Sequence, residues 1–144
     1  MSRGRIVLNS AEETASFGAM FASQLKAGQT LALKGDLGAG KTTFVQGLLK
    51  GFSISDVAQS PTFTYLQIYQ GTVPIYHFDL YRLKNEQDFV LLGFEEFLYG
   101  DGVAVIEWPE RISSLLPKDT HLIELSYIPQ GRTALVHSWG AREI

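Results

Sequence analysis

The sequence predicts an α/β fold in which helices cover both faces of a mixed sheet, giving a sandwich of three layers. Residues 30–33 are short, apolar and compatible with a strand, and residues 43–50 carry apolar groups at helical spacing. The glycine-rich segment 35–42 joins them, so the order is strand, loop, helix. A continuous apolar run, Val103–Ile106, is typical of a strand buried on both faces of a parallel sheet.

The first elements can be assigned in order from the N-terminus. Residues 6–8 predict a short strand. Ser10 followed by Glu13 forms a capping box, which predicts a helix that runs to about Lys26 and stops at Gly28. The expected buried face of that helix contains Ala15, Ala19, Ala22 and Leu25.

The later elements include two hairpins. Gly51 is expected to cap the helix that follows the loop. Residues 64–69 and 73–78 predict one hairpin, and residues 121–127 and 133–138 predict a second, antiparallel hairpin at an edge of the sheet. The remaining signals are a short helix capped by Asn85 and ended by Gly93, the strand Val103–Ile106, and a helical turn opened by Pro109.

Length and composition limit the classes of function. The 144 residues predict one domain, residues 1–144, and 45% hydrophobic with 19% charged residues predict a globular chain. A net charge of −3 gives no electrostatic footprint for autonomous nucleic-acid binding. The absence of cysteine excludes disulfides, thiolate metal sites and cysteine nucleophiles. No apolar run reaches membrane-spanning length and residues 1–5 lead into a strand, so a cytoplasmic protein is expected.

The segment Gly35–Thr42 is a complete G-x-x-x-x-G-K-[ST] phosphate-binding loop. Its glycines leave room for consecutive backbone N–H groups to point at a diphosphate, and the following helix presents its positive dipole end to the same phosphates. Lys41 supplies a mobile positive charge, and the Thr42 hydroxyl can coordinate Mg²⁺. The chain is therefore predicted to bind a nucleoside triphosphate with Mg²⁺. The expected nucleotide-binding residues of this segment are Asp36, Gly38, Ala39, Gly40, Lys41, Thr42 and Thr43.

Two carboxylates follow predicted strands. Glu107 comes directly after the buried run, the position of an acid that holds Mg²⁺ through water or polarises an attacking water. Asp is the usual residue there, and the alternative is a surface Glu at a strand end. Asp79 ends another strand, with an N-cap of the turn through Leu83 as its alternative. Thr62 occupies the chain position of a switch threonine, although a plain Pro-Thr turn explains it equally well.

Other polar and aromatic residues carry weaker signals. His77, His121 and His137 show no paired metal spacing and are interpreted as structural. No Asn/Thr-Lys-x-Asp guanine element occurs, which favours ATP over GTP, and the lack of an Arg-rich lid weakens the case for a small-molecule kinase. The aromatic residues interpreted as sheet packing, rather than as a base-stacking platform, are Tyr65, Tyr69, Tyr76, Phe78 and Tyr81.

These segments in this order resemble the TsaE (YjeE) family, the bacterial ATPase of tRNA threonylcarbamoyladenosine formation, and the fold expected from it is P-loop NTPase-like. The most specific strings are His-Phe-Asp-Leu-Tyr-Arg at 77–82 and Glu-Trp-Pro at 107–109. The resemblance covers nearly the whole chain. The matching segments are residues 35–44, 60–64, 76–83, 105–110 and 130–132.

The resemblance implies roles for single residues and a partner. Glu107 becomes the Mg²⁺-side carboxylate together with Thr42, and Asp79 becomes a catalytic or switch residue. Trp108 is placed close to the nucleotide as a sensor, and Arg132 is assigned to nucleotide binding. The implied partner is the TsaD–TsaB complex, which modifies the adenosine next to the anticodon of tRNAs reading codons that begin with A. ATP hydrolysis would drive cycling of that assembly, and tRNA would be reached through the complex.

Two other functions are also compatible with a phosphate-binding loop. A small-metabolite kinase of the P-loop class would transfer the terminal phosphoryl group to a bound acceptor. A nucleotide-gated binding module would have negligible turnover. In a chain of 144 residues there is little room for a substrate lid, and neither Arg82 nor Arg132 can be assigned as an internal cationic finger. We therefore expect an ATPase that is slow alone and depends on its partner.

Overall fold

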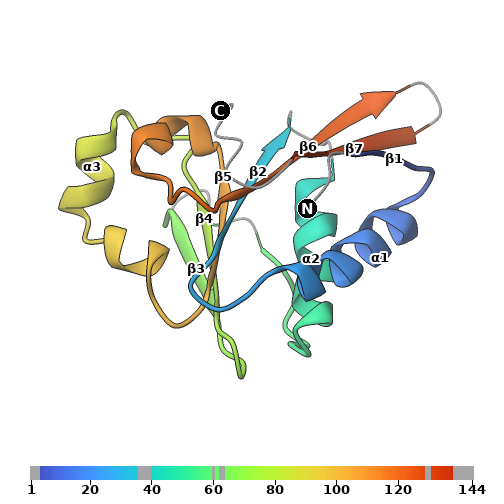
Figure 1. Cartoon of the computed structure of the whole chain (residues 1–144), viewed down its shortest axis with the longest axis horizontal. Helices are drawn as coiled ribbons and strands as arrows, with labels where there is room; N and C mark the ends of the chain where they lie inside the picture. Colours follow the sequence, from blue (N-terminus) through green and yellow to red (C-terminus); the bar gives the residue numbers. More distant parts are fainter. Residues whose placement is uncertain (1–3, 36–39, 60, 62–63, 129–130, 138–144) are drawn as a thin grey trace.

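A mixed sheet passes through the middle of the computed structural model, which describes residues 4–35, 40–59, 61, 64–128 and 131–137 (Figure 1). The sheet has seven strands in the order β1-β7-β6-β2-β5-β4-β3. The strand bounds are β1 (Gly4–Leu8), β2 (Thr30–Gly35), β3 (Leu66–Tyr69), β4 (Ile75–Asp79), β5 (Val103–Glu107), β6 (His121–Ile128) and β7 (Gly131–His137).

The pairing of the strands confirms the predicted mixed sheet. Strands β6, β2, β5 and β4 are parallel and form its centre. The hairpins β3–β4 and β6–β7 are both antiparallel, as predicted, and lie toward opposite edges. At the outer edge β1 pairs antiparallel with β7, so the two most distant strands in the chain are neighbours. The carboxyl ends of the four parallel strands consequently share one edge of the sheet.

Helices cover both faces of this sheet, which confirms the three-layer prediction (Figure 1). Helices α1 (Ala11–Phe21) and α2 (Lys41–Gly51) pack on one face. Helix α3 (Glu86–Leu91) and the 3₁₀ segments η2 (Glu95–Leu98) and η3 (Pro109–Leu115) pack on the other. A short 3₁₀ segment, η1 (Ala22–Gln24), follows α1.

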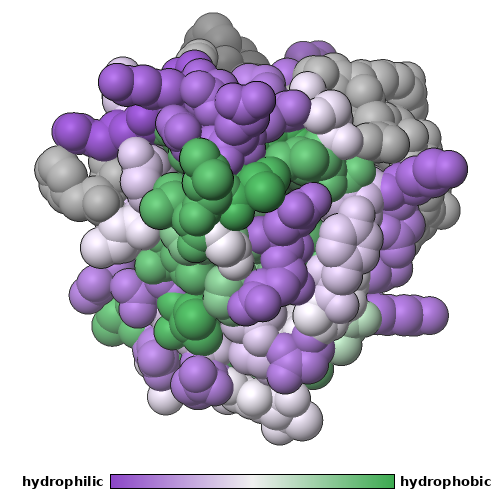
Figure 2. All heavy atoms as spheres, turned by 90° about the vertical axis from the view of Figure 1, so that its left-hand side faces the viewer, coloured by the Kyte–Doolittle hydropathy of each residue, from purple (hydrophilic) through white to green (hydrophobic). Residues whose placement is uncertain are grey.

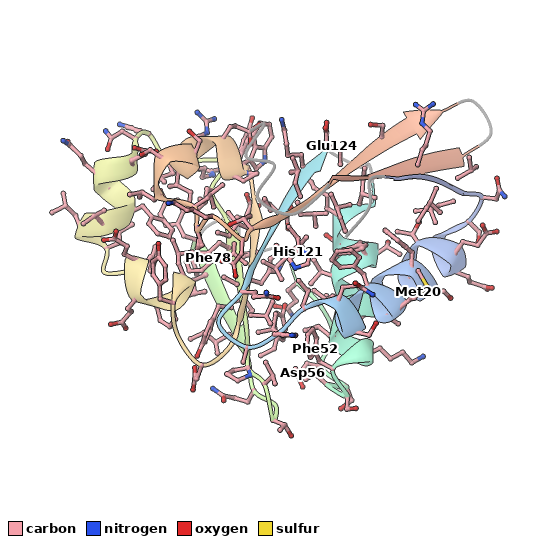
Figure 3. All side chains as sticks on the ribbon, in the orientation of Figure 1. Met20, Phe52, Asp56, Phe78, His121 and Glu124 are labelled. Carbon is pink, nitrogen blue, oxygen red and sulfur yellow. The ribbon has the colours of Figure 1, made fainter. Side chains whose placement is uncertain are left out.

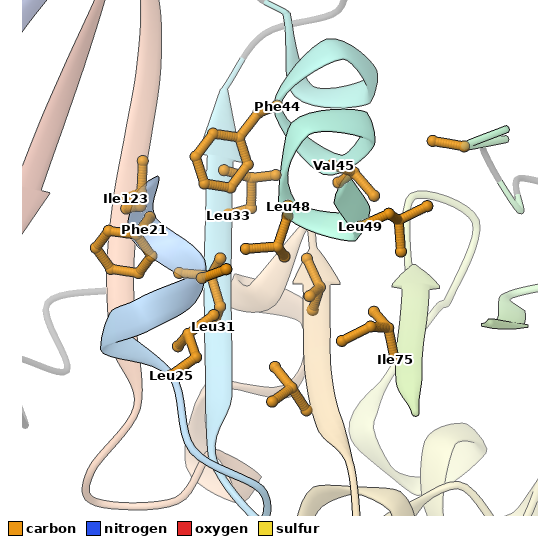
Figure 4. Close-up of a cluster of buried hydrophobic side chains, with 14 of the residues drawn as sticks. Phe21, Leu25, Leu31, Leu33, Phe44, Val45, Leu48, Leu49, Ile75 and Ile123 are labelled. Atoms are coloured by element: carbon orange, nitrogen blue, oxygen red, sulfur yellow. The ribbon is translucent and has the colours of Figure 1, made fainter. Parts of the chain in front are cut away.

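Strand β5 is buried on both faces because its side chains alternate between the two helical layers. Val103 and Val105 belong to the core beneath α1 and α2, part of which Figure 4 shows. Ala104 and Ile106 belong to the core beneath α3, η2 and η3. Every residue of β5 is buried, as the continuous apolar run predicted. Figure 3 labels Phe78, which belongs to the core beneath α3, η2 and η3. It also labels His121, whose ring packs edge-on against Phe21 in the core beneath α1 and α2.

Helices α1 and α2 approach so closely that glycine is required between them. A Cβ atom built at Gly47 would lie 1.9 Å from the backbone oxygen of Ala15, and one at Gly51 would lie 2.5 Å from that of Ala19. The prediction that Gly51 caps α2 is wrong, since α2 includes Gly51 and its C-cap is Phe52. Ser53 takes the left-handed conformation instead, with φ 61°. Gly51 serves packing between helices rather than the turn.

The start of α1 confirms Ser10 as its N-cap, although Glu13 accepts from the N–H of Asn9 rather than from that of Ser10 as a capping box would require. The end of α1 does not match the prediction. The Ser10 hydroxyl oxygen accepts from the Glu13 N–H at 3.1 Å, and the Glu13 carboxylate accepts from the Asn9 N–H at 3.1 Å. The helix ends at Phe21 rather than near Lys26, because the chain turns after η1 to bury Leu25 in extended conformation. The buried residues of α1 are Thr14, Phe17, Gly18 and Phe21. Of the residues predicted to be buried, Ala22 and Leu25 are buried, whereas Ala15 and Ala19 are half-buried.

Two strands are shorter than predicted for local reasons. Tyr65 adopts φ 66°, which is incompatible with an extended strand, so β3 begins at Leu66 rather than at residue 64. β4 begins at Ile75 rather than at residue 73, since Pro74 has no N–H to donate to a neighbouring strand. The short helix is as predicted: the Asn85 side chain accepts from the Asp88 N–H at 3.0 Å, and Gly93 ends it with φ 78°.

Candidate nucleotide-binding site

The junction between β2 and α2 joins a strand end to a helix start, in the order that the sequence predicted around the glycine-rich segment. β2 ends at Gly35 at the carboxyl edge of the sheet, and α2 begins at Lys41 after Gly40 in the left-handed conformation, φ 97°. Thr42 is exposed and Thr43 is half-buried in the first turn of α2, where helix N–H groups are available to an anion. Asp36, Gly38, Ala39 and the proposed switch residue Thr62 lie outside the described residues.

Lys41 is buried and points back across the loop. Its Nζ donates to the backbone oxygen of Gly35 at 2.8 Å and lies 3.6 Å from Oε1 of Glu107. The same Nζ lies 5.3 Å from the centre of the Trp108 ring, within the range of a cation–π contact. Lys41 therefore joins the start of α2 to the end of β5, a contact that the sequence analysis did not predict.

Glu107 and Asp79 lie side by side at the carboxyl edge. They are register partners in the parallel pair β4–β5, and strand alternation puts both on the face of the sheet that α2 covers. Glu107 is 4% exposed and Asp79 6% exposed. This burial rules out a surface Glu at position 107. The alternative role predicted for Asp79, that of a cap for the following turn, is also present, because its carboxylate accepts from the Tyr81 N–H at 3.1 Å.

His77 completes a buried polar chain that sequence analysis did not predict. Its Nε2 lies 2.6 Å from Oε2 of Glu107, and the side chain is fully buried. His77 was interpreted as structural, yet it shares a strand face with Asp79 because the two residues are two positions apart. This spacing of two positions is the feature of the sequence that could have placed His77 at the site. His77, Glu107 and Lys41 thus form one line of contacts from the sheet to the phosphate loop.

Trp108 sits at the mouth of this site in an unusual backbone conformation. Its φ and ψ are 60° and 50°, the left-handed region that a bulky side chain rarely occupies. The ring is held by Tyr81, whose ring centre is 5.0 Å away, and by the Arg111 guanidinium at 5.8 Å. Tyr81 therefore departs from the sheet-packing interpretation, while Tyr69, Tyr76 and Phe78 are buried as expected.

A cavity of about 190 Å³ opens beside the first residue of the loop. It lies between the ends of β2 and β6, with Trp108 on its wall. Its lining combines both charges and a hydroxyl, which suits a polar ligand rather than an apolar one. The lining residues are Lys34, Gly35, Trp108, Glu110, Glu124, Leu125 and Ser126.

Arg132 lies on the strand beyond β6, so it is separated from the loop by one strand. Its backbone pairs with Tyr127 near the start of β7, while Gly35 pairs with Leu125. The backbone of Arg132 is therefore at the carboxyl edge of the sheet, two register positions beyond the end of β2. Its predicted nucleotide contact stays a prediction.

The residues at this edge fit a Mg²⁺–nucleotide. Within the described residues, no group of three or more His, Cys, Asp or Glu could hold a metal by itself. Mg²⁺ bound with a nucleotide does not require such a group, since one or two protein ligands combine with phosphate oxygens and water. The exposed Thr42 hydroxyl and the Glu107 carboxylate would supply those ligands, and Lys41 with the start of α2 would face the phosphates.

Comparison with known proteins identifies the family. The family model described as threonylcarbamoyl adenosine biosynthesis protein TsaE matches residues 8–134. The chain belongs to the TsaE family. A TsaE protein of Treponema pallidum is 45% identical over 127 residues, covering 88% of this chain and 94% of that protein. The TsaE protein of Bacillus subtilis is 42% identical over 109 residues, which cover 75% of this chain and 68% of that one.

A solved structure supports the same conclusion for the fold. The crystal structure of Bacillus subtilis YdiB superposes with a TM-score of 0.78 at 33% identity, covering 97% of this chain and 86% of that one. The resemblance to the TsaE family inferred from the sequence motifs is thereby confirmed, as is the α/β fold. In the part of the chain that the structure describes, no helix is long and apolar enough to span a membrane.

Of the other two histidines, His121 packs away from this arrangement, and for His137 the structure describes only the backbone. His121 is buried beneath α1, and burial lowers its pKa to about 4, so it is uncharged at neutral pH. That state agrees with a structural role. His137 ends β7.

Proposed function

We propose that this chain binds ATP with Mg²⁺ and hydrolyses it as part of tRNA threonylcarbamoyladenosine formation in the cytoplasm, together with the TsaD–TsaB complex. The names of its relatives support the tRNA modification. One observation carries the ATPase assignment: Lys41 of the phosphate loop lies 3.6 Å from Glu107, which is buried beside Asp79 at the end of β5. A loop cation and strand-end carboxylates in this arrangement are the parts of a P-loop NTPase.

Each residue has a separate task in this proposal. Lys41 moves its ammonium group from Glu107 and the Gly35 oxygen to the phosphates, because phosphate oxygens offer a stronger charge-assisted bond than a backbone carbonyl. Glu107, held by His77, positions the attacking water or accepts its proton. Asp79 lies beside Glu107 and is connected through its own turn to Tyr81 and the Trp108 ring. Bound Mg²⁺ would neutralise charge on the phosphate oxygens.

The proposed partnership can be tested with purified components. We expect slow phosphate release by the chain alone, and association with the TsaD–TsaB complex that is stronger with ATP than with ADP. Addition of the chain and ATP should allow repeated threonylcarbamoyl transfer to tRNA. Fast hydrolysis by the isolated chain, without association and without any effect on transfer, would contradict the proposal.

The same assay distinguishes the remaining functions. An ATPase releases free phosphate, whereas a small-molecule kinase leaves a phosphorylated acceptor. A binding module associates with its partner in the ATP state but shows no turnover. Measuring phosphate release, labelled acceptor and association in one titration therefore separates the three.

The Lys41→Ala variant should bind ATP and ADP at least several-fold more weakly, because it removes a positive charge from beside the phosphates. The wild-type chain should also bind guanine nucleotides much more weakly than ATP, since the sequence carries no guanine element. Calorimetry measures both affinities. Lys50→Ala is a matched control, because Lys50 is exposed at the opposite end of α2. Equal ATP affinity in wild type and Lys41→Ala would be evidence against this site.

The fluorescence of Trp108 should report nucleotide binding. Its ring lies 5.3 Å from the Lys41 ammonium group, and movement of that cation toward phosphates alters the field at the indole. Trp139, which lies outside the described residues, should respond less. Titrations of Trp108→Phe and Trp139→Phe with Mg²⁺–ADP decide the assignment. A signal that survives in Trp108→Phe but vanishes in Trp139→Phe would show that the placement is wrong.

A further inference from the structure

The buried charged and imidazole side chains of this protein gather at one place. Figure 2 shows hydrophilic side chains over much of the face that carries α3, as expected for groups that are costly to remove from water. A fully buried histidine beside a buried carboxylate therefore requires a reason. In the described residues, the buried Lys, His, Asp and Glu side chains are Lys41, His77, Asp79, Glu107 and His121, and all except His121 belong to the candidate site.

The two carboxylate oxygens of Glu107 have different partners. Oε2 lies 2.6 Å from Nε2 of His77, which is a hydrogen bond between two buried side chains. Oε1 lies 3.6 Å from Nζ of Lys41, a distance that is longer than a hydrogen bond and leaves an ion pair. One oxygen is thus held from within the sheet, and the other lies on the side of α2, which begins at Lys41.

The surroundings of the His77 ring indicate which nitrogen carries its hydrogen. A carboxylate only accepts, so Nε2 must be the donor in the 2.6 Å contact with Glu107. The other ring nitrogen, Nδ1, is buried and has no hydrogen-bond partner within the part of the chain that the structure describes. Buried N–H groups without a partner are rarer than acceptors without one, which agrees with a bare Nδ1. The contacts therefore indicate the Nε2–H tautomer.

Glu107 needs such a donor because it is longer than the acid usually found at this position. Asp is the common residue at the end of this strand in phosphate-loop proteins, and Glu has one more rotatable bond. The last torsion of a Glu side chain has a broad distribution, so the carboxylate turns unless a contact holds it. The bond from His77 fixes Oε2 and, with it, the direction of Oε1.

The pairing of β4 with β5 decides where this donor lies. Asp79 pairs with Glu107 and His77 pairs with Val105, so His77 shares a strand face with Asp79 but lies one step further into the sheet. His77 consequently approaches Glu107 from the interior. The opposite side of the carboxylate remains directed at Lys41.

We propose that His77 is a positioning residue for ATP hydrolysis, whose Nε2–H holds Oε2 of Glu107 so that Oε1 alone changes its partner. Without a nucleotide, Oε1 pairs with Lys41. Once Lys41 has turned to the phosphates, Oε1 is the oxygen that acts on the attacking water or binds Mg²⁺. The inference rests on the proposed function and specifies which oxygen of Glu107 acts and what fixes its direction.

The first test removes the donor and then restores it. His77→Leu should lower kcat for ATP hydrolysis by about 10- to 100-fold, the loss typical when the hydrogen-bond partner of a metal-site carboxylate is removed. KM for ATP and affinity for ADP should change little. His77→Gln should recover much of the loss in kcat, because its amide Nε2 can donate as the imidazole Nε2 does.

His121 offers matched controls for the same two exchanges. It is also fully buried, but its ring packs against Phe21 beneath α1 and away from Glu107. His121→Leu and His121→Gln should therefore leave kcat unchanged. Urea unfolding of all four variants shows whether any loss of activity follows from loss of stability.

The second test needs neither nucleotide nor metal. Two-bond ¹H–¹⁵N correlation spectra of the wild-type chain should show a protonated Nε2 and a bare Nδ1 for His77, whose signals His77→Gln identifies by their loss. Glu107→Gln should shift these ring signals, because it removes the charge of the acceptor. Glu12→Gln, at an exposed position on α1, should not shift them.

The outcomes separate this inference from the proposed function. If the wild type hydrolyses ATP and His77→Leu matches its kcat, His77 is not a positioning residue while the proposed function stands. The inference also fails if His77→Gln folds stably but recovers no activity, if His121→Leu loses as much activity as His77→Leu, or if Nε2 of His77 proves to be bare. If the wild type hydrolyses no ATP even with TsaD–TsaB present, the proposed function and this inference both fail.

Discussion

Glu107→Gln should reduce ATP turnover by about 100-fold or more, the loss typical for a group that moves a proton or positions water in the transition state. The exchange keeps the shape of a buried side chain 2.6 Å from His77 while removing its charge. Affinity for ADP should be retained or should rise, because Lys41 loses the carboxylate that holds it away from the phosphates. Asp79→Asn should likewise reduce ATP turnover and retain affinity for ADP.

Single-turnover phosphate release and calorimetry with ADP measure the two effects separately. Glu12→Gln, at an exposed position on α1, is the control for removing one carboxylate. His77→Ala should show a smaller loss of turnover than Glu107→Gln, since it disturbs Glu107 without removing it. Collapse of ADP affinity in Glu107→Gln, with unchanged turnover for each bound ATP, would contradict the catalytic assignment.

Gly47→Ala should destabilise the fold by about 3 kcal/mol or more, which is large for the addition of one methyl group. In an ordinary exposed helix the same exchange stabilises by up to about 1 kcal/mol. Here the new Cβ would lie 1.9 Å from the Ala15 oxygen and 2.7 Å from the Ala15 Cα, and backbone atoms cannot rotate away. The two helices must separate, which opens the core they share with the sheet.

Urea unfolding followed by circular dichroism measures this free energy. Gly4→Ala is the control, because a Cβ at Gly4 meets no atom within 4 Å. The contact also matters for function, since α2 carries Lys41 at its first turn. Equal unfolding midpoints for Gly47→Ala and wild type would show that α1 and α2 do not pack as described.

Much of the fold could be predicted because its signals are local. The Ser10 cap, the Asn85 cap and the turn at Gly93 depend on contacts within a few residues, and all three are confirmed. Where local signals conflicted with packing, packing decided. Gly51 was predicted to cap α2 because glycine is common at that position. In the structure the close approach of α1 leaves no room for a side chain there, so Gly51 serves packing instead.

The candidate site could be predicted in part for the same reason. Strand ends mark Asp79 and Glu107, and the loop motif marks Lys41, so their gathering at one edge follows from parallel pairing. The contact between His77 and Glu107 could not be predicted, because it depends on the register between strands whose residues are 30 positions apart. A shift of one residue would turn His77 to the other face.

The sequence by itself determined the glycine-rich motif between a strand and a helix, the buried strand before Glu107, the alternation of helices and strands, and the absence of cysteine chemistry. Each of these depends on residue type and short-range periodicity. Only the tertiary structure decided that β1 pairs with β7, that His77 supports Glu107, and that Leu91 faces solvent rather than the core. The physical reason is that these outcomes depend on which surfaces are buried against each other by segments far apart in the chain, and local pattern carries no information about that choice.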